Sequence, residues 1–128
     1  MKEAIRAKDA PAAIGPYSQA VRAGGLLFLS GQIPLDPASG AIVGEDIAAQ
    51  TERVLQNVAA VLAAAGSSFD DVIKTTIFVV DMADYPKVNE VYGRFFREPF
   101  PARSTVQVAA LPRAARVEVE VVALSRGA

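Results

Sequence analysis

The chain has 128 residues, 52 % of them hydrophobic, and 13 basic against 14 acidic residues give a net charge of −1. It contains neither Cys nor His, which excludes disulfides, thiol nucleophiles, Cys/His zinc sites and histidine general bases. Charges of both signs are interspersed, apolar stretches are short, and no apolar leader follows Met1, so we expect one cytoplasmic domain over residues 1–128 with no nucleic-acid or membrane partner.

The first predicted elements are strands. The pattern allows a short strand at the start of the chain. Gln19–Ala23 and Leu26–Ile33 then read as two strands, and the Gly24-Gly25 pair between them predicts a hairpin turn. Residues 36–40 are rich in Asp, Pro, Ser and Gly, which is typical of a surface loop.

A long helix is predicted next, from about Asp46 to Ala65. Apolar residues recur every three or four positions, which gives the helix one buried stripe. Glu45 and Asp46 stand at its start, where the helix dipole favours anions, and Gly66 suits the position after its last turn.

The second half of the chain predicts three strands and one more helix. Val72–Val80 is apolar and β-branched almost throughout, so it reads as a central strand. Asp84 is the expected N-cap of the second helix, and Pro86 lies in its first turn. Strands Arg103–Leu111 and Val117–Leu124 follow, and the short loop between them is compatible with antiparallel pairing of the two.

These elements predict an α/β protein of the α+β type, with two helices on one face of a mixed sheet. The last strand alternates cleanly, so Glu118, Glu120, Val122 and Leu124 share one face. The sheet face without helices would be partly apolar. Burial of that face against other copies of the chain, in a cyclic oligomer, is the natural solution.

Two groups of residues are the main candidates for chemistry. Arg103 follows the rigid Pro101-Ala102 segment and could present its guanidinium to a substrate carboxylate, or could be a surface residue paired with a Glu. Glu118 and Glu120 share a strand face, where a partly buried carboxylate can position or deprotonate water, or they simply face solvent.

Other polar positions are less specific. Tyr17 follows Gly15-Pro16 and is rigidly placed, and Ser30-Gly31 follows an apolar strand where glycine allows a ligand to approach the backbone. Lys74 is read as a lysine that reaches solvent from a strand rather than as a Schiff-base residue. Asn89 could bind a ligand or face water. No phosphate loop, dinucleotide fingerprint or clustered metal ligands are found.

Read together, these segments resemble the reactive-intermediate deaminase family, also called the RidA, YjgF or UK114 family. The resemblance rests on Pro101-Ala102-Arg103-Ser104, Leu111-Pro112 and Val117-Glu118-Val119 near the end of the chain. It extends over nearly the whole chain through residues 13–20, Ser30-Gly31-Gln32-Ile33-Pro34, Val72–Thr76 and Val88–Tyr92.

The resemblance implies a chorismate-mutase-like fold and a homotrimer with ligand clefts between neighbouring subunits. It implies that Arg103 grips the substrate carboxylate and that Glu118 holds or activates the attacking water. It also implies that Tyr17, Ser30, Gly31 and Asn89 line the cleft, and that no metal or organic cofactor is needed. Many family members carry Cys two residues after the arginine, whereas this chain has Thr105, which can still donate a hydrogen bond.

The implied activity is that of a hydrolase acting on C=N bonds. Its substrates would be 2-imino acids or enamines, such as 2-iminobutanoate and 2-iminopropanoate, released by pyridoxal-phosphate enzymes. The products would be 2-keto acids and ammonia. Two alternatives stay open at the sequence level: a non-catalytic carboxylate-ligand sensor or chaperone-like protein, and an endoribonuclease-type translation inhibitor.

Overall fold

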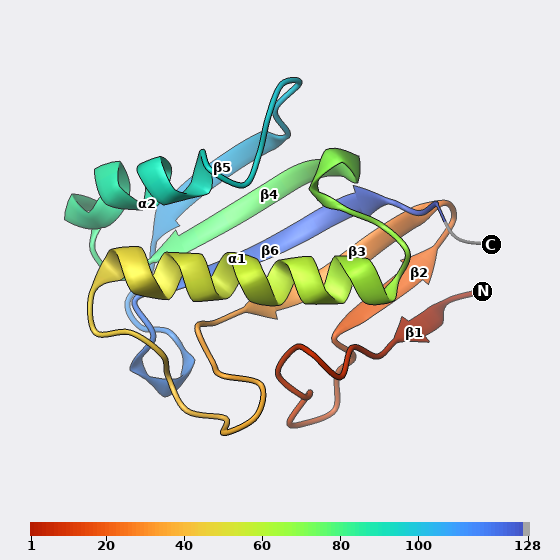
Figure 1. The fold of residues 1–128 in the computed structure, drawn as a ribbon, viewed down its shortest axis with the longest axis horizontal. Helices are drawn as coiled ribbons and strands as arrows, with labels where there is room; N and C mark the ends of the chain where they lie inside the picture. Colours follow the sequence, from red (N-terminus) through yellow and green to blue (C-terminus); the bar gives the residue numbers. More distant parts are fainter. Residues whose placement is uncertain (127–128) are drawn as a thin grey trace.

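A computed structural model describes residues 1–126, which form one six-stranded sheet and two α-helices (Figure 1). The strand order across the sheet is β1-β2-β3-β6-β4-β5. The strands are β1 (Glu3–Ile5), β2 (Ala20–Ala23), β3 (Leu26–Gln32), β4 (Val72–Val79), β5 (Ala102–Gln107) and β6 (Val117–Leu124). The helices are α1 (Ile47–Ala64) and α2 (Tyr85–Tyr92), and three short 3₁₀ turns lie at 69–71, 82–84 and 112–114.

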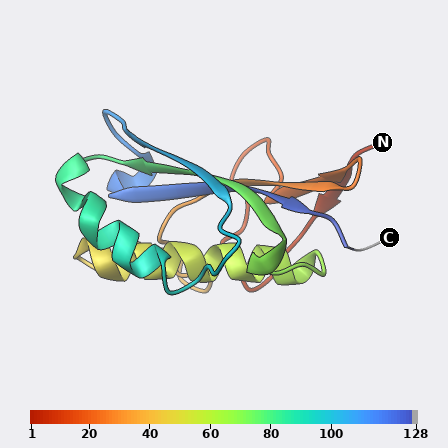
Figure 2. The same ribbon diagram turned by 90° about the horizontal axis from the view of Figure 1, so that it is seen from above.

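Both helices pack on the same side of the sheet, as the sequence predicted (Figure 2). The core lies between the two layers, and its largest fully buried side chains come from β3, α1, β4, α2 and β6. Alternation in β6 separates the faces: Val117, Val119, Val121 and Ala123 are buried under the helices. Glu118, Glu120, Val122 and Leu124 point to the other side, which we call the open face.

The pairing of the last two strands differs from the expectation. β6 runs antiparallel between β3 and β4, in the middle of the sheet. β5 instead pairs in parallel with β4 and forms an edge, and it ends at Gln107 rather than Leu111. The antiparallel pairing predicted for Arg103–Leu111 with Val117–Leu124 was therefore wrong. In this place both edges of β6 are paired and its alternating valines lie under the helices, and the loop between β5 and β6 is long enough to cross β4.

Helix α1 begins and ends as the sequence indicated. The Asp46 side chain accepts a hydrogen bond from the backbone N–H of Ala49 at 2.7 Å, which caps the first turn. Gly66 has a φ of +75°, the left-handed conformation that glycine tolerates best after a helix. Val54, Leu55 and Val58 are fully buried against the sheet.

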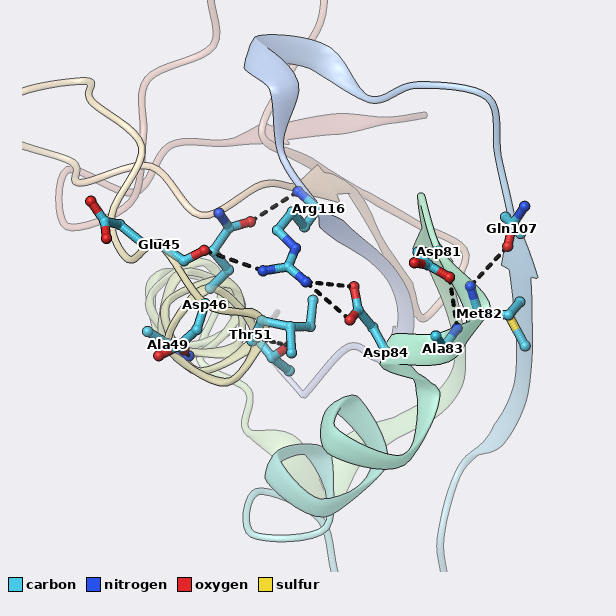
Figure 3. A network of polar contacts seen from close by, with 12 residues as sticks. Glu45, Asp46, Ala49, Thr51, Asp81, Met82, Ala83, Asp84, Gln107 and Arg116 are labelled. Atoms are coloured by element: carbon cyan, nitrogen blue, oxygen red, sulfur yellow. Dashed lines mark hydrogen bonds and ion pairs between the residues drawn. The ribbon is translucent and has the colours of Figure 1, made fainter.

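Helix α2 ends at Tyr92, and Asp84 does not cap it through its side chain as predicted. The Asp84 carboxylate accepts hydrogen bonds at 3.0 and 3.1 Å from the guanidinium of Arg116, at the start of β6 (Figure 3). Arg116 also donates to the Glu45 carbonyl, and its backbone N–H donates to Gln50. This network joins the beginnings of α1, α2 and β6. Because the Asp84 carboxylate pairs with Arg116, it does not cap α2.

The open face carries several apolar side chains. Phe28 is 46 % exposed, Val106 42 % and Leu124 38 %, and Phe28 lies directly opposite Val122 in the sheet register. Among the described residues, no helix is long and apolar enough to cross a membrane.

Candidate functional site

Arg103 lies near the start of β5, on the helix-covered side of the sheet, because its neighbour in the β4 register is the fully buried Thr75. Its Nη2 donates a hydrogen bond to the Tyr85 hydroxyl at 2.7 Å. The guanidinium carbon lies 5.6 Å from the centre of the Tyr85 ring and 4.9 Å from that of Tyr92. No carboxylate within residues 1–126 pairs with it. Within these residues, Arg103 therefore does not form the surface pair with a Glu that the sequence left open.

The two tyrosines form a rigid cradle for this guanidinium. The Tyr92 hydroxyl is hydrogen-bonded to Thr75 Oγ1 at 2.9 Å, and its ring stacks on Phe96 with 4.2 Å between centroids. Burial raises the pKa of Tyr92, while its hydrogen bond to Thr75 and the Arg103 charge lower it. The ring therefore stays neutral and fixed near neutral pH. Arg103 is thus preorganised as a cation that retains unused hydrogen-bond donors.

Thr105 and Asn89 lie near this cation. Thr105 follows two residues after Arg103 on the same strand face, and its hydroxyl is buried with no hydrogen-bond partner in residues 1–126. Asn89 is exposed on α2. Its spacing of four from Tyr85 and three to Tyr92 places it on the helix stripe that contacts Arg103. The Arg103 group, as it is called below, consists of Arg103, Tyr85, Tyr92, Thr105 and Asn89.

Tyr17, Ser30, Gly31 and Glu118 meet elsewhere, in a hollow of about 460 Å³ at the open face. Glu120 lines the same hollow, so both carboxylates reach it. The remainder of the wall is mainly apolar and comes from Pro11, Ala12, Ile14, Ile33, Leu35 and Pro112, together with Gln19 and Gln32. The Glu118 group, as it is called below, consists of Tyr17, Ser30, Gly31, Glu118 and Glu120.

Gly31 allows Glu118 to lie against β3. The register between β3 and β6 shifts between Leu29 and Gln32, and Gly31 lies in this irregularity. A Cβ built on Gly31 would overlap the carboxylate of Glu118, with 2.7 Å to its Cδ. Only glycine leaves that space free, so the Glu118 carboxylate packs directly against the Gly31 backbone at the edge of the hollow.

Glu118 is half-buried, whereas Glu120 is exposed. Burial raises the pKa of the Glu118 carboxyl, and the nearby Glu120 carboxylate raises it further. Neither carboxylate forms an ion pair within the described residues. Glu118 therefore has the environment of a proton-transferring carboxyl at the edge of a partly apolar hollow.

Hydrogen bonds fix the loop that carries Tyr17. Buried Gln19 accepts from the Ala7 N–H at 2.7 Å and donates to the Pro11 carbonyl at 2.7 Å. The Ser30 hydroxyl donates to the Ser18 carbonyl at 2.6 Å. The Tyr17 hydroxyl accepts from the Ile14 N–H at 3.3 Å, and its ring is 54 % exposed. Ser30 thus anchors the loop, and Tyr17 stands at the rim of the hollow.

The Arg103 group and the Glu118 group lie on opposite faces of the sheet, so one chain does not bring them together. Thr75 and Thr105 mark the helix-covered side, and Phe78 lies opposite Glu118 on the open side. Sequence reasoning overlooked Tyr85 and Tyr92 as neighbours of Arg103. Their spacing around Asn89 was the signal that could have revealed them.

Two further features bear on the choice of site. A larger hollow, about 970 Å³, lies between residues 4–19 and the end of α1. Its wall combines alanines with the charged residues Arg6, Lys8 and Asp9, and Tyr17 is the one predicted site residue that lines it among residues 1–126. Within residues 1–126, no three His, Cys, Asp or Glu side chains are grouped to hold a metal ion.

Comparison with known proteins places this geometry in context. A family model described as Endoribonuclease L-PSP matches residues 7–125. Protein DfrA of Myxococcus xanthus is 56 % identical over 126 residues, which cover 97 % of this chain and 96 % of that protein. The 2-iminobutanoate/2-iminopropanoate deaminase of Salmonella typhimurium is 48 % identical over 129 residues, covering 98 % of this chain and all of that protein.

A solved structure agrees over almost the whole chain. Escherichia coli TdcF, crystallised with bound serine, superposes with a TM-score of 0.90 at 45 % identity, covering 95 % of this chain and 98 % of that one. The agreement includes the six-stranded sheet with two helices on one face. The chain therefore belongs to the Endoribonuclease L-PSP family, which is the YjgF/RidA family indicated by its sequence motifs.

Proposed function

We propose that this protein hydrolyses 2-imino acids, such as 2-iminobutanoate and 2-iminopropanoate, to 2-keto acids and ammonia. Arg103 carries the proposal, because its guanidinium is held between two tyrosines without a carboxylate partner. A substrate carboxylate supplies the missing anion and can accept from the free face of the guanidinium. The deaminase of Salmonella typhimurium named above is a relative over the full length.

The reaction needs water rather than a strong nucleophile. Water attacks C2 of the protonated imine while Glu118 takes a proton from it, which forms a carbinolamine. Glu118 then returns this proton to nitrogen. As the C–N bond breaks, Glu118 accepts the proton of the hydroxyl group, the oxygen forms the keto group, and the departing ammonia takes that proton and leaves as ammonium. The raised pKa of Glu118 suits a carboxyl that both accepts and donates a proton. Orientation of water and C2 supplies the remaining acceleration.

A site that contains both groups requires two copies of the chain. We propose a homotrimer in which the Arg103 group of one copy faces the Glu118 group of its neighbour. The apolar side chains Phe28, Val106 and Leu124 on the open face support this assembly. In that cleft the unpaired Thr105 hydroxyl and the exposed Asn89 side chain would gain polar partners. One domain over residues 1–128, cytoplasmic and independent of cofactors, completes the proposal.

The test follows the imine directly. A threonine dehydratase generates 2-iminobutanoate in the presence of semicarbazide, and semicarbazone formation is recorded with and without the protein. We expect the protein to suppress semicarbazone formation. Arg103→Ala should lower the hydrolysis rate by about 10²- to 10⁴-fold, because two charge-assisted hydrogen bonds to the substrate are lost.

Arg94→Ala is the matched control. Arg94 is exposed on the surface, where it pairs with Glu90 at 3.1 Å, so its removal should leave hydrolysis unchanged. If folded wild-type protein leaves semicarbazone formation unaffected, this substrate is not hydrolysed. Serine or 2-oxobutanoate binding that is lost in Arg103→Ala would then identify the protein as a carboxylate-binding sensor. Incubation of the same samples with RNA tests the endoribonuclease alternative.

A further inference from the structure

Two carboxylates reach the hollow, and their surroundings differ. Glu118 and Glu120 are two residues apart on the same face of β6 and line the same cavity. Glu118 is half-buried and packs against the bare backbone of Gly31. Glu120 is exposed, and it also lines a second, smaller hollow of about 180 Å³ on the open face together with Lys74 and Thr76.

Lys74 is the basic residue on the Glu120 side. Thr76 lies directly opposite Glu120 in the β4–β6 register. The Lys74 ammonium donates to the Thr76 hydroxyl at 3.2 Å and to the Thr75 carbonyl at 3.1 Å. Its positive charge therefore lies beside Glu120 rather than Glu118.

Within residues 1–126 of a single chain, the other elements around Glu118 bring no compensating cation. On β3 its neighbours are Ser30 and Gly31, on β4 it lies opposite Phe78, and Tyr17 is the titratable group of the covering loop. The guanidinium of Arg116, two residues earlier, is engaged by Asp84 and by the Glu45 carbonyl. Within the chain, Glu120 is thus the charge that acts on Glu118.

We propose that Glu120 is a positioning residue for the reaction: its carboxylate, on the same strand face and in the same hollow as Glu118, directs the proton transfer to Glu118. Two like charges on one strand face cannot ionise equally easily, and the less solvated one takes the proton. This inference rests on the proposed function, since it assigns the proton transfer to Glu118. It adds a second acidic residue whose role is electrostatic, without contact with the reacting atoms.

The experiment measures protonation separately from turnover. Protein labelled with ¹³C at the glutamate carboxyl groups is titrated by NMR, with Glu118→Gln identifying the resonance of interest. We expect Glu118 to titrate above an ordinary glutamate, and Glu120→Gln to lower its midpoint. The acidic limb of the pH profile for imine hydrolysis should move to lower pH by the same amount.

Two variants separate charge from structure. Glu120→Asp keeps the negative charge and should preserve a raised Glu118 midpoint. Glu52→Gln makes the same chemical change at an exposed position on α1, and it should shift neither the midpoint nor the pH profile. An unchanged Glu118 midpoint in folded Glu120→Gln would overturn the proposal, as would a raised midpoint at Glu120 in place of Glu118.

The assay and the titration fail independently. If wild-type protein hydrolyses no imino acid while Glu120→Gln still lowers the Glu118 midpoint, the deaminase function is rejected and the electrostatic pairing is upheld. If hydrolysis is observed and Glu120→Gln leaves both midpoint and pH profile in place, the function stands and the role of Glu120 is rejected. Arg103 is unchanged in all these variants, so its charge does not account for the differences.

Discussion

Single residues determine how the side chains of the Arg103 group and the Glu118 group are positioned. Gly31 illustrates this best, because the absence of one carbon atom lets the Glu118 carboxylate occupy the space beside β3. The obstacle that a Cβ would meet is the end of a flexible side chain rather than backbone. Substitution therefore affects the position of Glu118 more than the stability of the sheet.

Gly31→Ala should leave the free energy of unfolding within about 1 kcal/mol of wild type. Imine hydrolysis should fall by about 100-fold, because a displaced carboxylate no longer aligns the water. Gly93→Ala is the control, since a Cβ there would meet the Asn89 carbonyl at an ordinary 3.4 Å. Urea unfolding and the semicarbazide assay measure the two effects. Wild-type turnover in Gly31→Ala would contradict the assigned position of Glu118.

Tyr85 is the residue whose hydroxyl orients Arg103. Tyr85→Phe keeps the ring under the guanidinium but removes the 2.7 Å hydrogen bond. Without this hydrogen bond, substrate binding should lose about 1 kcal/mol of free energy. KM should therefore rise about fivefold, with a smaller effect on kcat. Steady-state kinetics over a range of dehydratase flux measures this split.

Tyr92→Phe is the companion variant, and it should behave differently. It removes the hydrogen bond to the fully buried Thr75 hydroxyl, which costs about 1–3 kcal/mol of stability. Its effect on KM should be smaller than that of Tyr85→Phe. Equal effects of both variants on KM would mean that the Tyr85 hydroxyl has no special part in orienting Arg103.

At the scale of the elements, helix α1 packs on one face of the sheet, and the Asp46 side chain stabilises its first turn. Glu45 and Gln50 also accept hydrogen bonds from Arg116, which directly precedes β6 and lies two residues before Glu118, so this helix end helps to hold the start of β6. The cap therefore contributes to stability close to the strand that carries Glu118.

Asp46→Ala should lower the free energy of unfolding by about 0.5–2 kcal/mol, because the Ala49 N–H loses its acceptor. Glu45→Ala is the neighbouring control: the Glu45 backbone carbonyl accepts from Arg116, and the substitution leaves that carbonyl in place. Chemical denaturation of both variants measures the difference. A loss in Glu45→Ala equal to that in Asp46→Ala would attribute the effect to general helix-end charge rather than to the cap.

At the scale of the whole molecule, the open face connects folding with function. Its apolar side chains include Phe28, which is 46 % exposed in the single chain. The Arg103 group and the Glu118 group lie on opposite sides of the sheet. An assembly that buries the open face would therefore also complete the proposed site.

Phe28→Lys should dissociate the assembly, because a charge at a buried apolar contact is costly to desolvate. The fold should survive, since the side chain is already exposed in one chain. Analytical ultracentrifugation should show a smaller species, and imine hydrolysis should be lost. Ala63→Lys, on an exposed position of α1, should change neither. A fully active monomeric Phe28→Lys protein would show that one chain suffices.

The sequence by itself determined the class of fold, the position of α1 with its cap and its final glycine, and the alternation of β6. These features arise from local periodicity and turn chemistry, which act over a few neighbouring residues. Motif resemblance also selected Arg103 and Glu118. Only the tertiary structure decided that β6 lies between β3 and β4, that Asp84 binds Arg116 instead of capping α2, and that Tyr85 and Tyr92 hold Arg103. These contacts join residues far apart in the chain, and competing partners of similar chemistry can be distinguished only once the sheet order is fixed.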